Sequence, residues 1–349
     1  GWSLSVLIDE LGSLYAAAAS GERDLPRWAD RHLPPVVSFA RFLSHGAAVR
    51  RSEDFTGLEG WWKDRLSAPP PVPDMPGDRV RPTGAVRDPA GKRNTALLEA
   101  ALVTKLEAFG AARGSTLFHV LLTGWLALLH RLTGQDDLIV GVPTAGRGPD
   151  WAERVVGYCT HLLPVRSQMD DPAVSVDAFL RLTRDGLLDA QSHEDLPFAV
   201  MLERFKPKRD GDKPPLLGTI FNIDRPLGAP DFPGLEAGFV PRPVAAVAYD
   251  LAMNLLVLPE GIVAECDHAL EVISPEAAQA LLAWYRHLLE AMVETPDAPF
   301  STLSLDQGGA VLSGPAPRAA VSSVWDLITE ACARDPKALA ILETVGTGT

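Results

Sequence analysis

The sequence has little cysteine, a shortage of positive charge and no long apolar run, and each of these features excludes a class of protein. Its three cysteines, Cys159, Cys266 and Cys332, are widely spaced and form no Cys-x-x-Cys pair, so they indicate neither a disulfide framework nor a zinc site. The formal net charge of −13 argues against nucleic acid or an anionic membrane as partner, since both attract a basic face. No apolar stretch reaches the ~18 residues of a membrane-spanning helix. We therefore expect a cytoplasmic protein without a metal site.

The remaining composition is that of an ordinary globular protein. Hydrophobic residues make up 46% of the 349 residues and charged residues 22%, which suffices for a sizeable core. The chain starts without methionine and without a signal peptide, and it ends just after an apolar, strand-like run. We expect both ends to be internal to a longer protein.

Apolar residues alternate between helical and strand spacing along most of the chain. Leu121, Trp125 and Leu128 fall on one face of a helix, whereas the run at 137–142 is typical of a buried strand. Helices are predicted at 4–15, 37–44, 101–112, 116–132, 175–191, 197–204 and 275–294, and strands at 95–99, 137–142, 162–166, 217–223, 251–258 and 262–266. This alternation predicts an α/β sandwich around one large sheet.

Proline and small polar residues mark the candidate boundaries. Residues 68–90 contain seven prolines, which remove backbone donors and are typical of a linker. A second linker is predicted at 307–322. The tail at 323–349 has a short amphipathic helix and a strand, too little to bury a core of its own.

Short motifs follow one another in order between Gly1 and about Leu305. They are Gly1-Trp2-Ser3 before a helix, Gly134-Gln135-Asp136-Asp137 with Val140-Gly141-Val142-Pro143 and Ala145-Gly146-Arg147, Val156-Gly157 through Arg166, His193-Glu194-Asp195-Leu196-Pro197-Phe198, Phe221-Asn222, and Tyr249-Asp250-Leu251. This series resembles the condensation domains of non-ribosomal peptide synthetases, whose HHxxxDG signature, followed by Trp or Val and Ser, would end at Ser3. The family's Tyr-x-Asp-Phe-Ala-x-Trp block is matched at 36–42 only by Phe39 and Ala40.

The resemblance implies a fold and a division of the chain. The family has a chloramphenicol-acetyltransferase-like sandwich of two lobes. Residues 1–67 would be a remnant of the first lobe, 68–90 the linker between lobes, and 91–306 a complete second lobe. The tail at 323–349 resembles the start of an adenylation domain.

The resemblance also implies amide formation between acyl and aminoacyl thioesters. Phosphopantetheine arms of upstream and downstream peptidyl carrier domains would carry both substrates, an adenylation domain would adjoin, and no cofactor would be bound directly. The catalytic HHxxxD would precede Gly1, so no residue of this chain is expected to be catalytic and the fragment alone is expected to be inactive. Two alternatives remain open, a non-catalytic docking module and a stand-alone acyltransferase that uses coenzyme A. The donor acyl group and the acceptor amino acid are not specified by the sequence.

By the same resemblance, eight residues belong to a substrate channel: Gly1, Trp2, Ser3, Gly146, Arg147, His161, Arg166 and Asn222. His161 stands where the family has asparagine, and it would either hydrogen-bond a tetrahedral oxyanion or be buried against a backbone carbonyl. Arg166 is a ligand contact or an internal salt-bridge partner. Asn222 orients a thioester or holds a strand end.

Three further positions are interpreted as structural. His193 and Asp195 are predicted to cap a helix that begins at Pro197, with Asp195 near the N-cap. Ser3 is a candidate N-cap for the first helix.

Overall fold

The structure is a computed structural model that describes residues 1–70, 72, 77, 79, 87–171, 173–207, 214–228, 231–240 and 243–305. The chain divides into two units, Gly1–Leu312 and Ser313–Thr349, and every described residue lies in the first. The predicted linker at 307–322, the tail at 323–349 and most of the segment at 71–86 thus lie outside the described residues.

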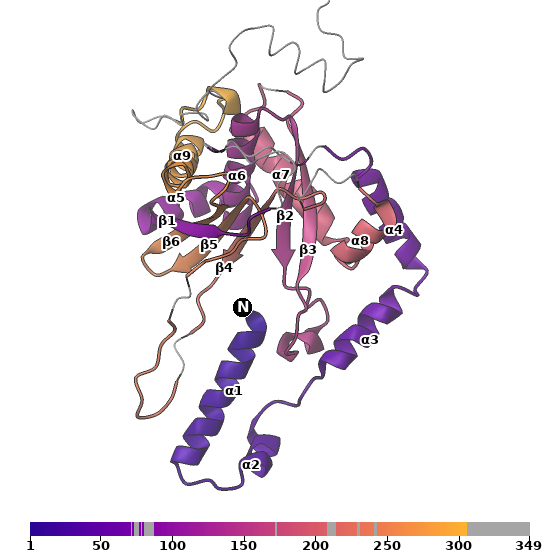
Figure 1. Ribbon diagram of the computed structural model, residues 1–349, viewed down its shortest axis with the longest axis vertical. Helices are drawn as coiled ribbons and strands as arrows, with labels where there is room; N and C mark the ends of the chain where they lie inside the picture. Colours follow the sequence, from indigo (N-terminus) through magenta and orange to yellow (C-terminus); the bar gives the residue numbers. More distant parts are fainter. Residues whose placement is uncertain are drawn as a thin grey trace, which may run out of the picture. The chain divides into compact units, whose positions relative to one another are not determined.

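A six-stranded mixed sheet is formed between residues 91 and 269 (Figure 1). Its strands are β1 (Gly91–Glu99), β2 (Asp137–Thr144), β3 (His161–Gln168), β4 (Thr219–Asp224), β5 (Leu251–Leu258) and β6 (Gly261–Ala269). Their order is β1-β6-β5-β4-β2-β3, with β4 parallel to both β2 and β5 and the other pairs antiparallel. This confirms the predicted α/β class, and every predicted strand end lies within four residues of the observed one.

The helices are assigned in chain order. They are α1 (Trp2–Ala19), α2 (Leu25–His32), α3 (Phe39–Val49), α4 (Asp54–Arg65), α5 (Ala100–Ala111), α6 (Leu117–Thr133), α7 (Val176–Gln191), α8 (Phe198–Phe205) and α9 (Pro275–Glu294), with short 3₁₀ turns η1 (Asp150–Arg154) and η2 (Phe300–Thr302). The sequence pattern did not predict α2 or α4. Neither carries a continuous apolar stripe: α2 buries no side chain, and α4 buries only Phe55 and Trp62.

The core lies between the sheet and α5, α6, α7 and α9, which pack against it (Figure 1). Side chains alternate along β5, where Met253 and Leu255 are buried and Asn254 is half-buried. The α6 helix is buried almost throughout, and the Tyr285 hydroxyl of α9 donates to its Leu121 carbonyl over 2.8 Å. The buried side chains of the helices and those of the sheet therefore form one apolar layer.

Two histidines of α6 complete this layer. His119 accepts the Thr116 N–H at Nδ1 and so closes a capping box at the start of α6. His130 lies within 2.6 Å of the Gln135 carbonyl and 3.0 Å of Ser167 Oγ. Burial lowers the pKa of both rings, which favours their neutral form. Both residues therefore act as parts of the core.

Candidate functional site

The first turn of α1 is fixed to the connection between β2 and β3. Trp2 Nε1 donates to the Glu153 carbonyl over 2.7 Å. Ser3 Oγ donates to the Gly157 carbonyl over 2.8 Å and accepts the Gly157 N–H over 3.1 Å. The prediction that Ser3 caps the helix is wrong, because Gly1 is the N-cap and the Ser3 hydroxyl is used across the chain.

Arg147 holds the other side of this contact. Its Nη1 donates to the carbonyls of Ala152 over 2.5 Å and Val155 over 2.8 Å, and its Nη2 donates to Ser3 Oγ over 3.0 Å. The guanidinium also lies 5.8 Å from the centre of the Trp2 ring. We call Trp2, Ser3 and Arg147 the anchor cluster. Because these carbonyls and the Ser3 hydroxyl take up its donors, Arg147 shapes the loop rather than presenting a free cation.

Gly146 allows the loop to close. Its φ is +60°, and a Cβ atom there would lie 1.8 Å from the Cys159 carbonyl oxygen. A side chain is therefore excluded both by conformation and by space. The close approach of residues 146 and 159 is what brings the two strand ends together.

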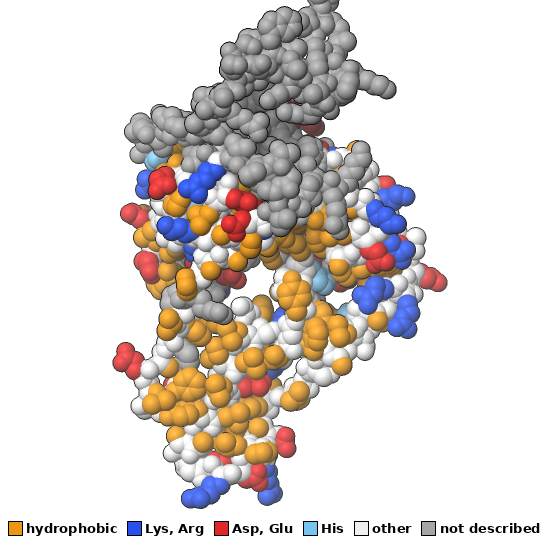
Figure 2. All heavy atoms as spheres, viewed as in Figure 1, with side chains coloured by type: hydrophobic (Ala, Val, Ile, Leu, Met, Phe, Trp, Pro, Cys, Tyr) orange, Lys and Arg blue, Asp and Glu red, His pale blue; other side chains and the backbone are white. Residues whose placement is uncertain are grey.

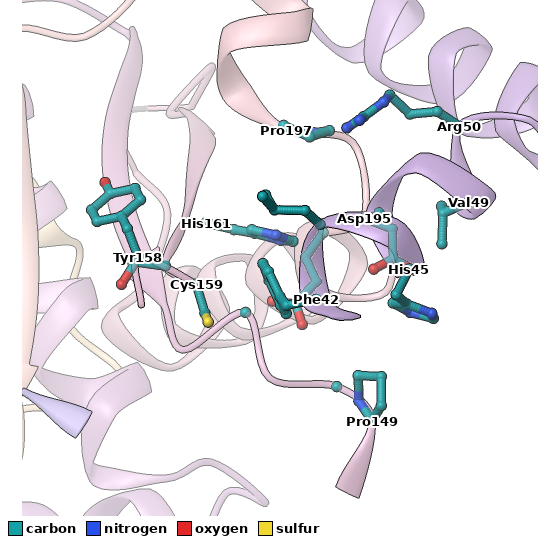
Figure 3. A pocket seen from close by; sticks show the side chains of 16 residues that line it. Phe42, His45, Val49, Arg50, Pro149, Tyr158, Cys159, His161, Asp195 and Pro197 are labelled. Carbon is teal, nitrogen blue, oxygen red and sulfur yellow. The ribbon is translucent and has the colours of Figure 1, made fainter. Parts of the chain in front are cut away.

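A pocket of about 250 Å³ lies on the α3 side of this loop (Figure 3). Its lining comes from α3, from the loop after β2, from residues 158–161 and from the turn before α8. Apolar walls come from Phe42 and Val49 of α3 and from Pro149 and Tyr158. The volume suits a group smaller than a drug-sized ligand.

His161 extends from the start of β3 into this pocket (Figure 3). Its Nδ1 is buried and has no hydrogen-bond partner among the described residues, so the predicted pairing with a backbone carbonyl is wrong for this atom. Thr144, its partner in the β2–β3 register, likewise has a buried hydroxyl without a partner among those residues. The neighbouring Cys159 is buried, and this burial raises the pKa of its thiol. The pocket thus contains a weakly reactive thiol and an unpaired imidazole nitrogen.

Arg166 is an internal salt-bridge partner and does not line this pocket. Its guanidinium pairs with Asp137, with Nη2 2.6 Å from Oδ2. It also donates to the carbonyls of Arg65, Ser67 and Ala68, at and just after the end of α4. Asp137 is the main reason that the pKa of Arg166 is raised. Arg166 therefore ties α4 to the edge strand β3.

Asn222 lies in a polar row across one face of the sheet. Its Nδ2 donates to Asn254 Oδ1 and to Asp224 Oδ2, each over 2.9 Å. Asn254 in turn donates to Glu265 over 2.7 Å, and Glu265 pairs with Arg93. Asn222 thus holds neighbouring strands together, at a place separate from the pocket.

The predicted capping role of His193 and Asp195 is wrong. The α8 helix begins at Phe198 with Pro197 as N-cap, and no side chain caps it. The ring of His193 stacks on Trp61 of α4, with centroids 4.0 Å apart and planes 7° apart. The His193 carbonyl accepts the indole N–H of Trp62 over 2.8 Å. His193 therefore joins α4 to the turn, while Asp195 lines the pocket.

The contribution of α3 to the pocket was not predicted from the sequence. Phe42, His45, Val49 and Arg50 all line the pocket, but the pattern predicted a helix that ended at residue 44. The continued spacing of Phe42, Val49 and their neighbours was the available signal. Among the described residues there is no cluster of three or more potential metal ligands. Within that same set, no helix is long and apolar enough to cross a membrane.

Comparison with known proteins identifies relatives along nearly the whole chain. The family model "Condensation domain" matches residues 1–308. One of the linear gramicidin synthase proteins of Brevibacillus parabrevis is 29% identical over 99% of this chain, and surfactin synthase subunit 1 of Bacillus subtilis is 29% identical over 87%. The chain spans only 4% and 8% of the lengths of these two proteins.

Solved structures share the fold. The X-domain from teicoplanin biosynthesis aligns with a TM-score of 0.75 and 20% identity, covering 86% of this chain and 68% of its own. The condensation domain of the monacolin K polyketide synthase MokA aligns with a TM-score of 0.70 and 17% identity, covering 86% and 68%.

Proposed function

This chain belongs to the condensation-domain family, and from that premise we propose that it is part of an enzyme that forms amide bonds between carrier-bound thioesters. The amine of an aminoacyl thioester attacks the carbonyl carbon of an acyl thioester. A C–N bond forms, the C–S bond breaks, the amine loses a proton and the sulfur leaves as a thiol. Phosphopantetheine arms of upstream and downstream peptidyl carrier domains present the two substrates in the cytoplasm, and an adenylation domain beginning at 323–349 adjoins.

The anchor cluster is the observation that carries this proposal. It attaches Gly1-Trp2-Ser3, the end of the family's signature, to the loop that forms the pocket wall through Arg147 and Gly157. A general base that precedes Gly1 would then be attached to backbone that the anchor cluster holds in place. Proton transfer by a correctly placed base accelerates a reaction roughly 10²–10⁴-fold. The residues of this chain hold the first turn of α1 in place and form the wall of the pocket that the substrates enter.

The surface of α1 supports the division into lobes. Leu4, Leu7 and Leu11 repeat at helical spacing and are 45%, 48% and 55% exposed. Apolar side chains gather over this helix (Figure 2). An apolar stripe of this kind is typical of a surface that another element covers. We propose that residues 1–67 are part of a first lobe and that 91–306 form the second.

The test is a condensation assay on the parent protein extended upstream of Gly1. With an intact HHxxxD, we expect amide product from acyl- and aminoacyl-loaded carriers in a single-turnover reaction, and loss of product when the second histidine is replaced by alanine. Arg147→Met in the same protein should slow the reaction, whereas Arg181→Met, which alters an exposed ion pair on α7, serves as the matched control. An extended protein that carries the motif and makes no amide would refute the proposal.

A second candidate is a recruitment module without catalysis. The teicoplanin X-domain, which shares the fold, has been solved in complex with OxyB. A degenerate or missing HHxxxD upstream of Gly1 would favour this function, and an intact motif would argue against it.

A further inference from the structure

A second pocket, also of about 250 Å³, lies between the second half of β3, α7 and the end of α4. We call it the α7 pocket. It shares no lining residue with the pocket beside α3. Its volume is below the range of sites for drug-sized ligands, so we expect a ligand of about the size of a free amino acid.

The wall of the α7 pocket that faces the core is apolar. Leu126 of α6, Val165 of β3 and Phe179 of α7 contribute to it, and each is at most 2% exposed. Leu182 of α7 also lines the pocket and is 57% exposed, so the apolar surface continues from the core to the solvent. An apolar group of a ligand would be removed from water against these side chains, which favours binding.

Two hydroxyl-bearing side chains line the same pocket and have unused hydrogen-bonding capacity. Thr183 of α7 is 6% exposed, and its buried Oγ1 has no partner among the described residues. A buried hydroxyl without a partner is unfavourable, so Thr183 indicates a missing polar group. His130 Nδ1 lies 2.6 Å from the Gln135 carbonyl and therefore carries the ring proton. His130 Nε2 then accepts the O–H of Ser167 over 3.0 Å, which leaves the lone pairs of Ser167 Oγ for a donor in the pocket.

The half-buried guanidinium of Arg65 lies against α7. A Cβ atom at Gly186 would lie 3.1 Å from its Nη2, and its central carbon is 6.0 Å from the centre of the Trp61 ring. Within the described part of the chain, this guanidinium forms no hydrogen bond or ion pair, and neither does the carboxylate of Asp189. Both residues line the α7 pocket. One turn of α7 therefore contacts an unpaired cation and carries an unpaired anion.

The other charges of the α7 pocket are compensated within the protein. Arg166 pairs with Asp137, and Asp185 pairs with its neighbour Arg184 over 2.8 Å. The ligand therefore meets one cation, one anion and an apolar wall. A simple anion would be repelled by the free carboxylate, a simple cation would be repelled by the free guanidinium, and an apolar molecule would leave both charges unpaired. A zwitterion with an apolar substituent complements the cation, the anion and the wall together.

We propose that the α7 pocket binds a free α-amino acid with an apolar side chain. The carboxylate of the ligand pairs with Arg65, its ammonium donates to Asp189, and its side chain lies against Phe179. The hydroxyls of Ser167 and Thr183 bond to the same two polar groups, Ser167 as an acceptor from the ammonium and Thr183 as a donor to the carboxylate. This site takes an amino acid that is not attached to a carrier, and it does not depend on the proposed function.

Three small molecules test the two charges of the ligand separately. Free leucine has the ammonium, the carboxylate and an apolar side chain, whereas leucinamide lacks the carboxylate and N-acetylleucine lacks the ammonium. In a ligand-observed NMR titration of this chain, we expect leucine to bind. Each derivative should bind at least tenfold more weakly, because it leaves one charged group of the pocket without its partner. Absence of leucine binding at millimolar concentration, or equal binding of either derivative, would overturn the proposal.

Two variants test which residue meets which charge. Arg65→Met should weaken leucine binding at least tenfold and remove the preference for leucine over leucinamide. Asp189→Asn should weaken it to a similar degree and remove the preference for leucine over N-acetylleucine. Lys63→Met changes an exposed residue of α4 that does not line the pocket, so it is the matched control and should alter neither preference. A variant of Arg65 or Asp189 that kept both preferences would contradict the assignment, because a merely structural role would not affect one derivative selectively.

A pair of glycine variants shows which pocket holds the amino acid. Gly186 lines the α7 pocket, and a Cβ there meets only the flexible end of Arg65 at 3.1 Å, so Gly186→Leu fills the space. Gly46 lines the pocket beside α3, and a Cβ there meets only Arg50 Nη1 at 3.9 Å. We expect Gly186→Leu to abolish leucine binding and Gly46→Leu to leave it unchanged, with circular dichroism confirming that each variant is folded. The reverse result would place the amino acid beside α3 and refute the α7 pocket.

Discussion

The contact of Arg166 with Asp137 and the end of α4 allows a quantitative prediction. The side chain of Arg166 is only 13% exposed, and its guanidinium pairs with Asp137 and donates to three backbone carbonyls. Arg166→Met keeps much of the apolar stem but leaves the Asp137 carboxylate, itself 29% exposed, without its cation. Breaking a fully buried pair costs about 3–5 kcal/mol, and partial exposure of Asp137 reduces this, so we expect about 2–3 kcal/mol.

Urea unfolding of the chain measures this loss directly. In a thermal melt the same change should lower Tm by roughly 3–4 °C, since the unfolding entropy near Tm is about 2.1 cal/mol/K per residue. Asp137→Asn combined with Arg166→Met should recover part of the loss, because no unpaired carboxylate remains. Arg181→Met, whose side chain is 54% exposed, should cost less than about 1 kcal/mol. If Arg166→Met changed stability as little as this control, Arg166 would not be the link between α4 and β3.

Three further predictions concern the loop, the core and the surface. Gly146→Ala should lower the free energy of unfolding, measured in a urea titration, by more than about 3 kcal/mol, because the new Cβ would lie 1.8 Å from a carbonyl oxygen. Gly148→Ala is the control and should change it little, because a Cβ there has nothing within 4 Å. Burial lowers the pKa of His130 in the folded state, so the unfolded chain binds more protons at acid pH, and stability should fall as pH drops below ~6.5. A urea midpoint that rises on acidification would contradict this. Leu7 and Leu11 are exposed on α1, so glutamate at both positions should reduce aggregation of this chain by light scattering, and unchanged scattering would argue against α1 as its cause.

Periodic segments were predictable from the sequence because one face of each is buried. The α6 helix and strands β2 to β6 show apolar spacing that only one type of element satisfies, so their positions follow from local pattern and burial. The short connection at residues 259–260, between β5 and β6, also has a local cause. Gly261 has φ of +142°, which an L side chain rarely adopts, and the turn is short enough to set the β5–β6 register. By contrast, α4 packs against the rest of the chain through the single aromatic rings of Phe55 and Trp62, so its sequence shows no helical repeat of apolar residues.

The roles of individual polar residues were decided only by the tertiary structure. Arg166 and His161 lie on the same strand five residues apart, yet one is saturated by Asp137 and three carbonyls while the other has a ring nitrogen without a partner among the described residues. Asp195 has the sequence position of a helix cap but lines a pocket, because α8 begins only at Phe198. The sequence by itself determined the periodic helices and strands and the resemblance to the family. Which hydrogen-bond donors and acceptors meet depends on contacts between residues more than a hundred positions apart, and local pattern carries no information about these.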